Sequence, residues 1–361
     1  MERLYSLQGL RGVAVLGVVL FHMMSVEAKY AGGDILLPRV LDFFQLGVDL
    51  FFVISGFVMV IVSRGRFRKP VEAQRFMFNR LTRIYPTYWL YFFITLAVYL
   101  VQPALVNSGH GSSNLLMSFL LLPSDKVLLV MVAWSLVFEL WFYLVFSAFL
   151  LQRESRLPVA LAIWAALLMG FNTLASWEDY GPALKIILHP YALEFIAGSL
   201  LALFFYSRHS ARLPTAAVWV LLTAALLVGM PAIGWLRLYD EQSVLRMLAV
   251  GATFGVLVLT LALLERRGHL RFPTSLVAVG DMSYTIYLSH LLVLGVIGRA
   301  WVWLGASPDT LLDNLLFAGL MMAAVVCYGW VGYRGFEKPV LDRANAVSKR
   351  RFKTGAVHAG S

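Results

Sequence analysis

The chain has 361 residues, of which 60% are hydrophobic and 14% charged, and its mean hydropathy is +0.76. This composition is too apolar for a soluble globular domain, so it predicts an integral membrane protein whose solvent is the bilayer. The formal charge of +10 argues little for nucleic acid as a partner, because no soluble fold is available to present the basic residues. A single cysteine, Cys327, excludes a disulfide framework and a cysteine-based metal site.

Ten apolar runs are long enough to cross a bilayer core of ~30 Å, which takes ~20 residues of helix. They lie at about 7–27, 45–63, 84–103, 127–151, 157–175, 185–206, 215–232, 246–264, 280–303 and 311–333. The sequence therefore predicts an all-α polytopic fold with about ten transmembrane helices, in which residues 1–339 form a single transmembrane domain. The run at 115–122 is too short to span, so it predicts an interfacial or re-entrant segment, and whether it enters the membrane stays open.

Basic residues divide unevenly between the two ends of these runs. An even number of spans puts both termini on one side, and 23 of the 30 Lys and Arg residues fall on that side, against 7 on the other. Because cytoplasmic loops carry an excess of Lys and Arg, both termini are expected in the cytoplasm. The basic segment 340–361 is expected to be a disordered cytoplasmic tail. A signal peptide over residues 13–26 is the alternative for the first span, but that span fits the charge pattern.

The first span carries two ionisable side chains, Arg11 and His22. Such groups cost ~2.5 to 3.5 kcal/mol at the centre of a spanning helix, so each is a candidate functional residue. Their separation of eleven residues places them within about 20° of one helix face and ~16 Å apart along the axis. One face can therefore hold both ends of an extended ligand. The alternative is that Arg11 snorkels to the interface and His22 only bonds a neighbouring helix.

Two acidic residues lie within predicted spans. Asp49 is near the outer end of the second span, between Gly47 and Gly56, which would let a neighbouring helix approach closely. Capping the helix N-terminus is its alternative role. Glu139 lies inside the long apolar run of the fourth span, where no capping role explains it. A carboxylate there would orient a histidine or transfer a proton, and a purely structural role is the alternative.

The segment between the second and third spans is strongly basic, with seven Lys and Arg residues between Arg64 and Arg83. Anionic lipid headgroups account for most of them. Arg80 and Arg83 are three residues apart, on one face of a predicted helix that enters the third span. Because paired guanidinium groups bind phosphates bidentately, a cytosolic ligand that carries phosphates is a further prediction.

The ninth span contains a polar stripe of Ser283, Tyr287 and His290, at i, i+4 and i+7. This stripe is expected to face protein rather than lipid, and hydrogen bonding between helices is the commoner use of such a stripe. The sequence contains no His-x-x-x-His, His-Glu-x-x-His, Gly-rich phosphate loop or Gly-x-Ser-x-Gly motif. It therefore predicts neither a metal site nor a serine hydrolase mechanism.

Taken in order, these motifs resemble membrane acyltransferase family 3. The motifs are Leu10-Arg11-Gly12 with His22, the segment 47–57, Arg80-x-x-Arg83-Ile84-Tyr85-Pro86, Trp134-Ser135-Leu136 with Glu139, and Ser283-Tyr284 with His290. The resemblance runs from about residue 7 to Pro339. Residues 29–57 and 83–89 look most like the exopolysaccharide acetyltransferases of the succinoglycan type.

The resemblance implies a membrane O-acyltransferase of the bacterial inner membrane. It would move an acetyl or other short acyl group from cytosolic acyl-CoA to a sugar hydroxyl of an exopolysaccharide or its lipid-linked precursor. Acetyl-CoA would be a substrate, no cofactor would be bound permanently, and membrane lipids would be the other partners. Arg11, Arg80 and Arg83 would bind the donor, and Asp49 and Glu139 would occupy the acidic positions of their motifs.

Two features bear on how far the resemblance extends. Phe21 and Met23 flank His22, so a carboxylate partner for this histidine would come from another helix. Some family members also carry an extracellular esterase-like domain after the last span, and this chain is expected to complete the transfer without one.

A sugar hydroxyl is a poor nucleophile at neutral pH, so His22 is expected to act as the general base, with Glu139 or Asp49 as its orienting carboxylate. A covalent acyl-histidine relay is the alternative, and it also requires His22. A transporter or flippase of a glycan precursor is the rival class, since sparse buried charges would serve it too. Acylation of peptidoglycan or a small molecule by the same family is also compatible. The acceptor sugar, the acyl chain and the oligomeric state are not predicted.

Overall fold

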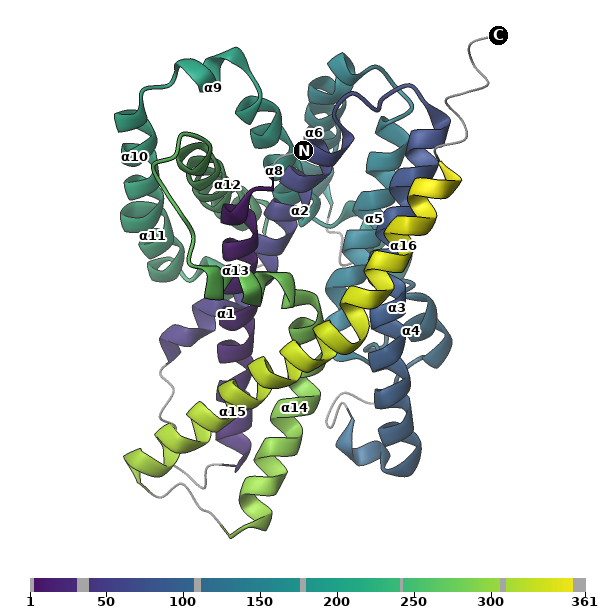
Figure 1. Cartoon of the computed structure of the whole chain (residues 1–361), viewed down its shortest axis with the longest axis vertical. Helices are drawn as coiled ribbons and strands as arrows, with labels where there is room; N and C mark the ends of the chain where they lie inside the picture. The colour runs from purple at the N-terminus through teal and green to yellow at the C-terminus, as the bar shows by residue number, and fades with distance from the viewer. Residues whose placement is uncertain are drawn as a thin grey trace. The chain divides into compact units, whose positions relative to one another are not determined.

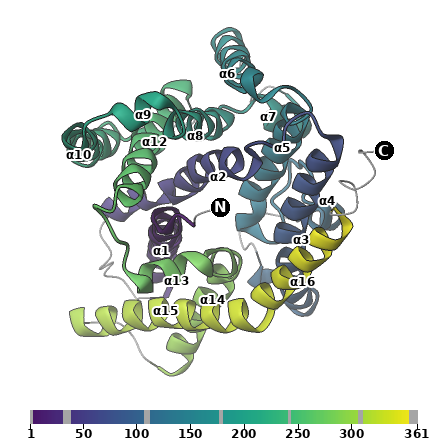
Figure 2. The same ribbon diagram turned by 45° about the horizontal axis from the view of Figure 1, so that its top comes forward.

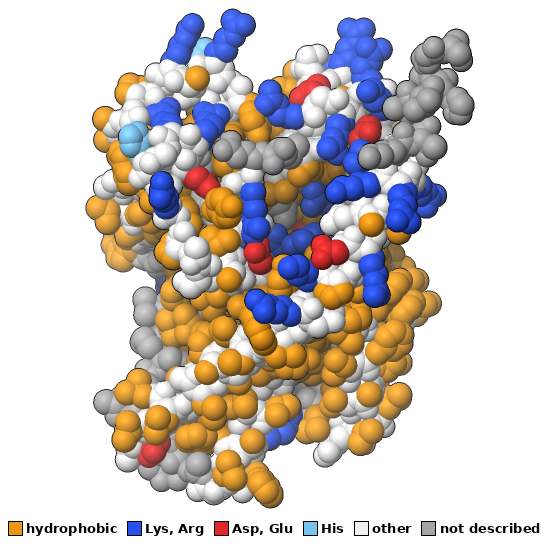
Figure 3. Space-filling model, viewed as in Figure 1, with side chains coloured by type: hydrophobic (Ala, Val, Ile, Leu, Met, Phe, Trp, Pro, Cys, Tyr) orange, Lys and Arg blue, Asp and Glu red, His pale blue; other side chains and the backbone are white. Residues whose placement is uncertain are grey.

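A computed structural model of the chain describes residues 3–30, 39–106, 112–175, 180–240, 243–305 and 310–352. Over these ranges the chain is helical and contains no β-strand. Ten of its helical segments are long and apolar enough to cross a membrane, which confirms the predicted all-α polytopic fold. Hydrophobic side chains occupy much of the visible surface, as expected where helices face lipid (Figure 3).

The helices follow one another as Figure 1 shows. The main helices of the ten spans are α1 (Tyr5–Tyr30), α2 (Gly47–Ser63), α3 (Pro70–Val101), α5 (Trp134–Phe149), α6 (Leu157–Leu174), α8 (Ala192–Phe205), α10 (Thr215–Ala224), α12 (Val244–Arg266), α14 (Ser283–Trp303) and α15 (Leu311–Gly332). The shorter helices are α4 (Leu115–Leu120), α7 (Pro182–Leu188), α9 (Arg208–Arg212), α11 (Met230–Trp235), α13 (Thr274–Asp281) and α16 (Lys338–Arg351).

Two helices differ in extent from the predicted spans. α3 begins at Pro70 rather than at residue 84, because proline at the first helical position is pre-organised for a helix start. Arg80 and Arg83 therefore lie inside this helix, as their spacing predicted. The predicted ninth span is interrupted at Met282, which separates α13 from α14. The run at 115–122 forms only the six-residue helix α4, which is too short to span.

The C-terminal segment is more ordered than predicted. Residues 340–351 were expected to be disordered, but they lie in α16, which packs beside α3 (Figure 1). Phe352 packs against Phe78 of α3 with 5.9 Å between ring centroids, and this apolar contact anchors the helix. Basic residues in the last turn of α16 also favour the negative end of the helix dipole. Residues 353–361 of the predicted tail lie outside the described residues.

The chain forms two compact units. Unit 1 consists of Met1–Phe51, Pro214–Glu241 and Val256–Arg334, and unit 2 of Phe52–Leu213, Gln242–Gly255 and Gly335–Ser361. Within unit 1, α1 packs against α13 and α14, and α14 packs against α15 (Figure 2). Within unit 2, α3 packs against α5 and α16, and α6 packs against α8.

The glycines at both ends of the second-span motif sit where helices touch. A Cβ atom on Gly47 would lie 2.5 Å from the carbonyl oxygen of Ala14 in α1. A Cβ atom on Gly56 would lie 2.0 Å from the carbonyl oxygen of Phe195 in α8. Both distances are far below a normal contact, so these positions need glycine, and the predicted close approach of neighbouring helices is confirmed.

The first turn of α1 is capped from a distant part of unit 1. The Glu265 carboxylate accepts hydrogen bonds from the backbone N–H groups of Tyr5, at 2.7 Å, and Ser6, at 2.8 Å. The first N–H groups of a helix have no partner inside it, and a negative charge is favourable there. Arg3 adds an ion pair to Asp281, with 2.6 Å between Nη2 and Oδ2. The start of the first span is thus held by residues that follow it by more than 250 positions.

Candidate functional site

His22 of α1 and His290 of α14 lie against each other within unit 1. Their ring centroids are 4.9 Å apart, and His290 Nε2 lies 3.3 Å from His22 Nδ1. His290 is fully buried, whereas His22 is partly exposed and also packs edge-on against Phe21. Two histidines that the sequence singled out in separate spans therefore form one site, in which His22 is the more accessible ring.

Backbone carbonyls determine which nitrogen of each ring carries the proton. His22 Nδ1 lies 2.9 Å from the carbonyl oxygen of Val18, and His290 Nδ1 lies 2.7 Å from that of Tyr287. Because a carbonyl can only accept a hydrogen bond, both Nδ1 atoms are assigned as donors. In each neutral ring Nε2 then holds the lone pair. His22 Nε2 can accept a proton from a substrate, while His290 Nε2 faces the N–H group of His22 as an acceptor.

A row of side chains in unit 1 connects this pair with Arg11. The Arg11 guanidinium carbon lies 6.0 Å from the centroid of the Phe51 ring. Phe51 packs edge-on against Tyr287 at 6.2 Å, and the Tyr287 ring lies 6.0 Å from that of His290. The row thus accompanies α1 over the ~16 Å between Arg11 and His22. It gives this helix face a continuous aromatic and polar lining.

The other candidates in unit 1 are buried. Ser283 and His290 are 0% exposed and Tyr287 is 6% exposed, so the polar stripe of α14 faces protein, as predicted. Asp49 is the third residue of α2 and is 2% exposed. Its carboxylate therefore lies in the first helical turn, where the helix dipole favours a negative charge.

The remaining predicted site residues meet in a second cluster, within unit 2. Ser55 Oγ donates to Glu139 Oε1 at 3.2 Å, and the Tyr143 hydroxyl donates to the same oxygen. The Arg80 guanidinium carbon lies 5.4 Å from the centroid of the Tyr143 ring. Both Arg80 and Arg83 interact electrostatically with the Tyr143 hydroxyl. Glu139 and the arginine pair, predicted for different tasks, thus belong to one charged cluster.

These contacts bear on the expected partner of His22. The hydrogen bonds described for Glu139 are with Ser55 and Tyr143, whereas the side chain that hydrogen-bonds the His22 ring is a second imidazole. The assignment of Glu139 or Asp49 as the orienting carboxylate stays a prediction. Tyr143 was not predicted from the sequence as a site residue, although it follows Glu139 by four residues and so shares its helix face.

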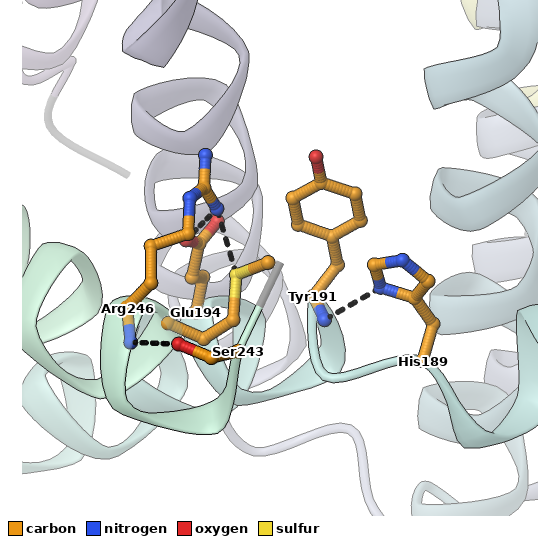
Figure 4. Close-up of polar contacts among 6 residues, drawn as sticks. His189, Tyr191, Glu194, Ser243 and Arg246 are labelled. Carbon is orange, nitrogen blue, oxygen red and sulfur yellow. Dashed lines mark hydrogen bonds and ion pairs between the residues drawn. The ribbon is translucent and has the colours of Figure 1, made fainter. Parts of the chain in front are cut away.

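A buried ion pair in unit 2 was also missed. Arg246 Nη1 lies 3.4 Å from Glu194 Oε1, and the two side chains are 3% and 0% exposed (Figure 4). The Arg246 guanidinium also lies 5.5 Å from the ring centroid of Tyr191, which stacks on His189 at 4.3 Å. The available signal was Glu194 itself, an acidic residue inside the apolar run 185–206.

Comparison with known proteins identifies the family. A family model described as an acyltransferase domain matches residues 4–334. The exopolysaccharide production protein ExoZ of Rhizobium meliloti is 34% identical over 319 residues, which cover 86% of this chain and 92% of the relative. Nodulation protein 10 of Rhizobium leguminosarum bv. viciae is 26% identical over 306 residues, covering 72% and 76%.

A more distant relative is the peptidoglycan O-acetyltransferase OatA of Listeria monocytogenes, 23% identical over 379 residues that cover 93% of this chain and 55% of the relative. No solved structure matches the chain. The family match covers nearly all of the described helices, including both polar clusters and all but the C-terminal end of the ten candidate spans. The chain therefore belongs to acyltransferase family 3 and is a multi-pass membrane O-acyltransferase.

Proposed function

We propose that the protein moves an acetyl or other short acyl group from cytosolic acyl-CoA to a sugar hydroxyl of an exopolysaccharide or its lipid-linked precursor. The observation that carries this proposal is the His22–His290 pair, because it leaves an accessible imidazole Nε2 ready to accept a proton. A hydroxyl acceptor needs such a base at neutral pH. The 34% identical relative is an exopolysaccharide production protein, which supports this class of acceptor over peptidoglycan or a small molecule.

In this proposal the acceptor hydroxyl attacks the thioester carbonyl while His22 Nε2 takes its proton. The carbon–sulfur bond then breaks, and the CoA thiolate leaves with the proton returned by His22. His290 Nε2 accepts a hydrogen bond from His22 Nδ1 and so stabilises the ring while it is positively charged. Arg11 binds the donor, whose pantetheine arm follows the row of side chains along α1 towards His22.

The same nitrogen could instead attack the thioester and form an acyl-imidazole, which the sugar hydroxyl would then break. Both routes use His22 Nε2, so loss of activity does not separate them. The two routes are separated by incubating the protein with labelled acetyl-CoA in the absence of acceptor. Label on the protein that disappears when acceptor is added supports the relay, and its absence supports direct transfer.

Arg80 and Arg83 are proposed to bind phosphates of the donor. Both are partly exposed and neither forms an ion pair with Glu139, whose carboxylate is engaged by Ser55 and Tyr143 among the described residues. The Arg80 guanidinium is positioned by the Tyr143 ring, and a partly exposed pair of guanidinium groups suits recognition of phosphate oxygens.

The function is tested with the purified full-length chain in lipid vesicles, supplied with radiolabelled acetyl-CoA and the matching unacetylated glycan. We expect alkali-labile label in the glycan, since an ester is formed. Replacement of His209, an exposed histidine of α9, by glutamine is the matched control and should leave transfer unchanged. Movement of the glycan across the vesicle membrane without incorporation of label would favour the transporter instead.

The proposed location is the bacterial inner membrane with both termini in the cytoplasm, based on the 23 to 7 division of basic residues. Single cysteines are placed at Ser112 and at Ala346 of α16, both exposed, in a Cys327→Ala background. An impermeant thiol reagent added to intact spheroplasts should label position 112 and spare position 346. Labelling of both positions from the same side contradicts this orientation.

A further inference from the structure

An apolar groove runs along the surface of unit 2 between α3 and α5. Its volume is about 670 Å³. Pro70, Ala73 and Met77 line it from α3, and Leu144 and Ala148 line it from α5. The small side chains of the two alanines leave space between the helices, and the larger side chains form the walls of the groove.

The length of the groove matches one leaflet of a bilayer. Its lining extends from Trp141 in α5 to Leu151 in the turn after that helix, ten residue steps, or ~15 Å at the helical rise. The hydrocarbon core of a bilayer is ~30 Å thick, so one leaflet accounts for about half of that. An apolar channel of this length on a lipid-facing helix pair fits a single acyl chain.

Three basic residues adjoin the lining of the groove in the sequence, at the start of α3 and just after α5. Arg68 and Lys69 directly precede Pro70, and Arg153 follows Leu151 by two residues. All three basic residues are exposed. Acidic groups of the same segments already have partners, since Glu72 pairs with Arg66 and Arg75, and Glu154 accepts from the backbone N–H of Gly65 at 3.0 Å. The three exposed cations are therefore available to a ligand outside the chain.

The position of Arg68 is fixed by the backbone. Its N–H group donates to the carbonyl oxygen of Leu150 at 2.8 Å, which satisfies a carbonyl at the C-terminal end of α5. Arg68 has φ +64°, a left-handed conformation that a non-glycine residue keeps only where its surroundings hold it. The segment that carries Arg68 and Lys69 is thus tied to the end of α5, where the groove opens.

We propose that this groove binds one anionic glycerophospholipid. Its acyl chain lies between α3 and α5, and its phosphate lies at Arg68, Lys69 and Arg153. Burial of the chain contributes through its methylene groups, and the three cations attract a headgroup with net negative charge more strongly than a zwitterionic one. The charge pattern assigns this end of the groove to the cytoplasmic leaflet. The inference does not depend on the proposed donor or acceptor.

The test uses the full-length protein reconstituted with equal amounts of phosphatidylglycerol and phosphatidylcholine, then released for native mass spectrometry. We expect the wild-type protein to retain one phosphatidylglycerol about tenfold more often than phosphatidylcholine. The Arg68→Gln/Lys69→Gln variant should lose this preference. The matched control is Arg208→Gln/Arg212→Gln, which removes the same amount of charge from two exposed arginines of α9. This variant should keep the preference for phosphatidylglycerol.

The apolar part is tested by filling the groove with Ala148→Leu, which should reduce retention of both lipids. Ala166→Leu, on an exposed position of α6 away from the groove, is the control. Wild-type retention in Ala148→Leu, or an unchanged lipid preference in Arg68→Gln/Lys69→Gln, would overturn the proposal. A shift from dimer to monomer in Ala148→Leu would assign the groove to a second copy of the chain instead. Unchanged thermal unfolding shows that each variant is folded.

Discussion

The polar clusters of the two units use different chemistry. In unit 1, His22 and His290 are imidazoles whose Nδ1 atoms lie within hydrogen-bonding distance of backbone carbonyls. In unit 2, Glu139, Tyr143 and Arg80 combine a carboxylate, a phenol and a permanent cation. A histidine can gain and lose a proton near neutral pH, whereas an arginine cannot. We therefore propose proton transfer at the histidine pair of unit 1 and recognition of donor phosphates at the arginine pair of unit 2, which would add to the binding proposed for Arg11.

The largest loss of activity is expected at His22, the residue proposed to accept the proton. His22→Gln should lower acyl transfer by ~10²- to 10⁴-fold, the usual contribution of a general base. The rate is measured as label incorporated into glycan at saturating acetyl-CoA, with the amount of folded protein checked by size-exclusion chromatography. Transfer within a few-fold of the wild-type rate would remove His22 from the mechanism.

Replacement of both Arg80 and Arg83 by lysine keeps the charge of unit 2 but loses the guanidinium geometry. We expect the KM for acetyl-CoA to rise by roughly 10- to 100-fold, because hydrogen bonds to charged groups contribute ~1.5 to 3 kcal/mol each. The maximal rate should change much less. As a control, Arg208→Lys/Arg212→Lys should leave KM unchanged. If KM is also unchanged in the Arg80/Arg83 variant, these arginines have only a role in topology.

His290 is a positioning residue, so its replacement should cost less than that of His22. His290→Phe removes the second and longer of the two contacts of His22 Nδ1–H, at 3.3 Å, and leaves the Val18 carbonyl at 2.9 Å, so it should lower transfer roughly 3- to 10-fold, the equivalent of one hydrogen bond of ~1 kcal/mol. His290→Gln can present an amide oxygen to the same N–H group and should restore part of the rate. A glutamine variant as slow as the phenylalanine variant would show that packing, not this hydrogen bond, is what His290 provides.

The smallest effect is expected for Tyr143→Phe. It removes one of the two hydrogen bonds described for Glu139 while it keeps the ring beside Arg80. Side-chain hydrogen bonds between membrane helices contribute ~0.6 kcal/mol on average, and we expect a similarly small value for this bond within α5, so stability should fall only slightly. Thermal unfolding in one detergent measures it. A rate as low as that of His22→Gln would instead assign Tyr143 to the chemistry and break the division between the units.

The ten spans could be predicted because a helix needs ~20 apolar residues to cross a bilayer, and runs of that length can be recognised in the sequence alone. Single site residues such as Glu139 were found for the related reason that a charge inside an apolar run is costly. Their partners were not, because the sequence does not state which helices touch. His22 and His290 are 268 residues apart, and the bond between them depends on the packing of α1 against α14.

The ordered helix α16 illustrates a different limit. Its composition is polar and basic, which predicts disorder when the segment is considered alone. One aromatic residue at its end, Phe352, packs against Phe78 and gives the helix an anchor on α3. A prediction from composition averages over the whole segment, so it does not detect a single side chain that anchors the helix.

The capping of α1 by Glu265 also has a consequence for biosynthesis. The helix that enters the membrane first receives its cap from a residue made 260 positions later. At ~5 to 20 residues per second, translation needs on the order of 10 to 50 s to reach that residue. During this interval water or lipid headgroups must satisfy the N–H groups of Tyr5 and Ser6, so the first span to be inserted is among the last to be completed.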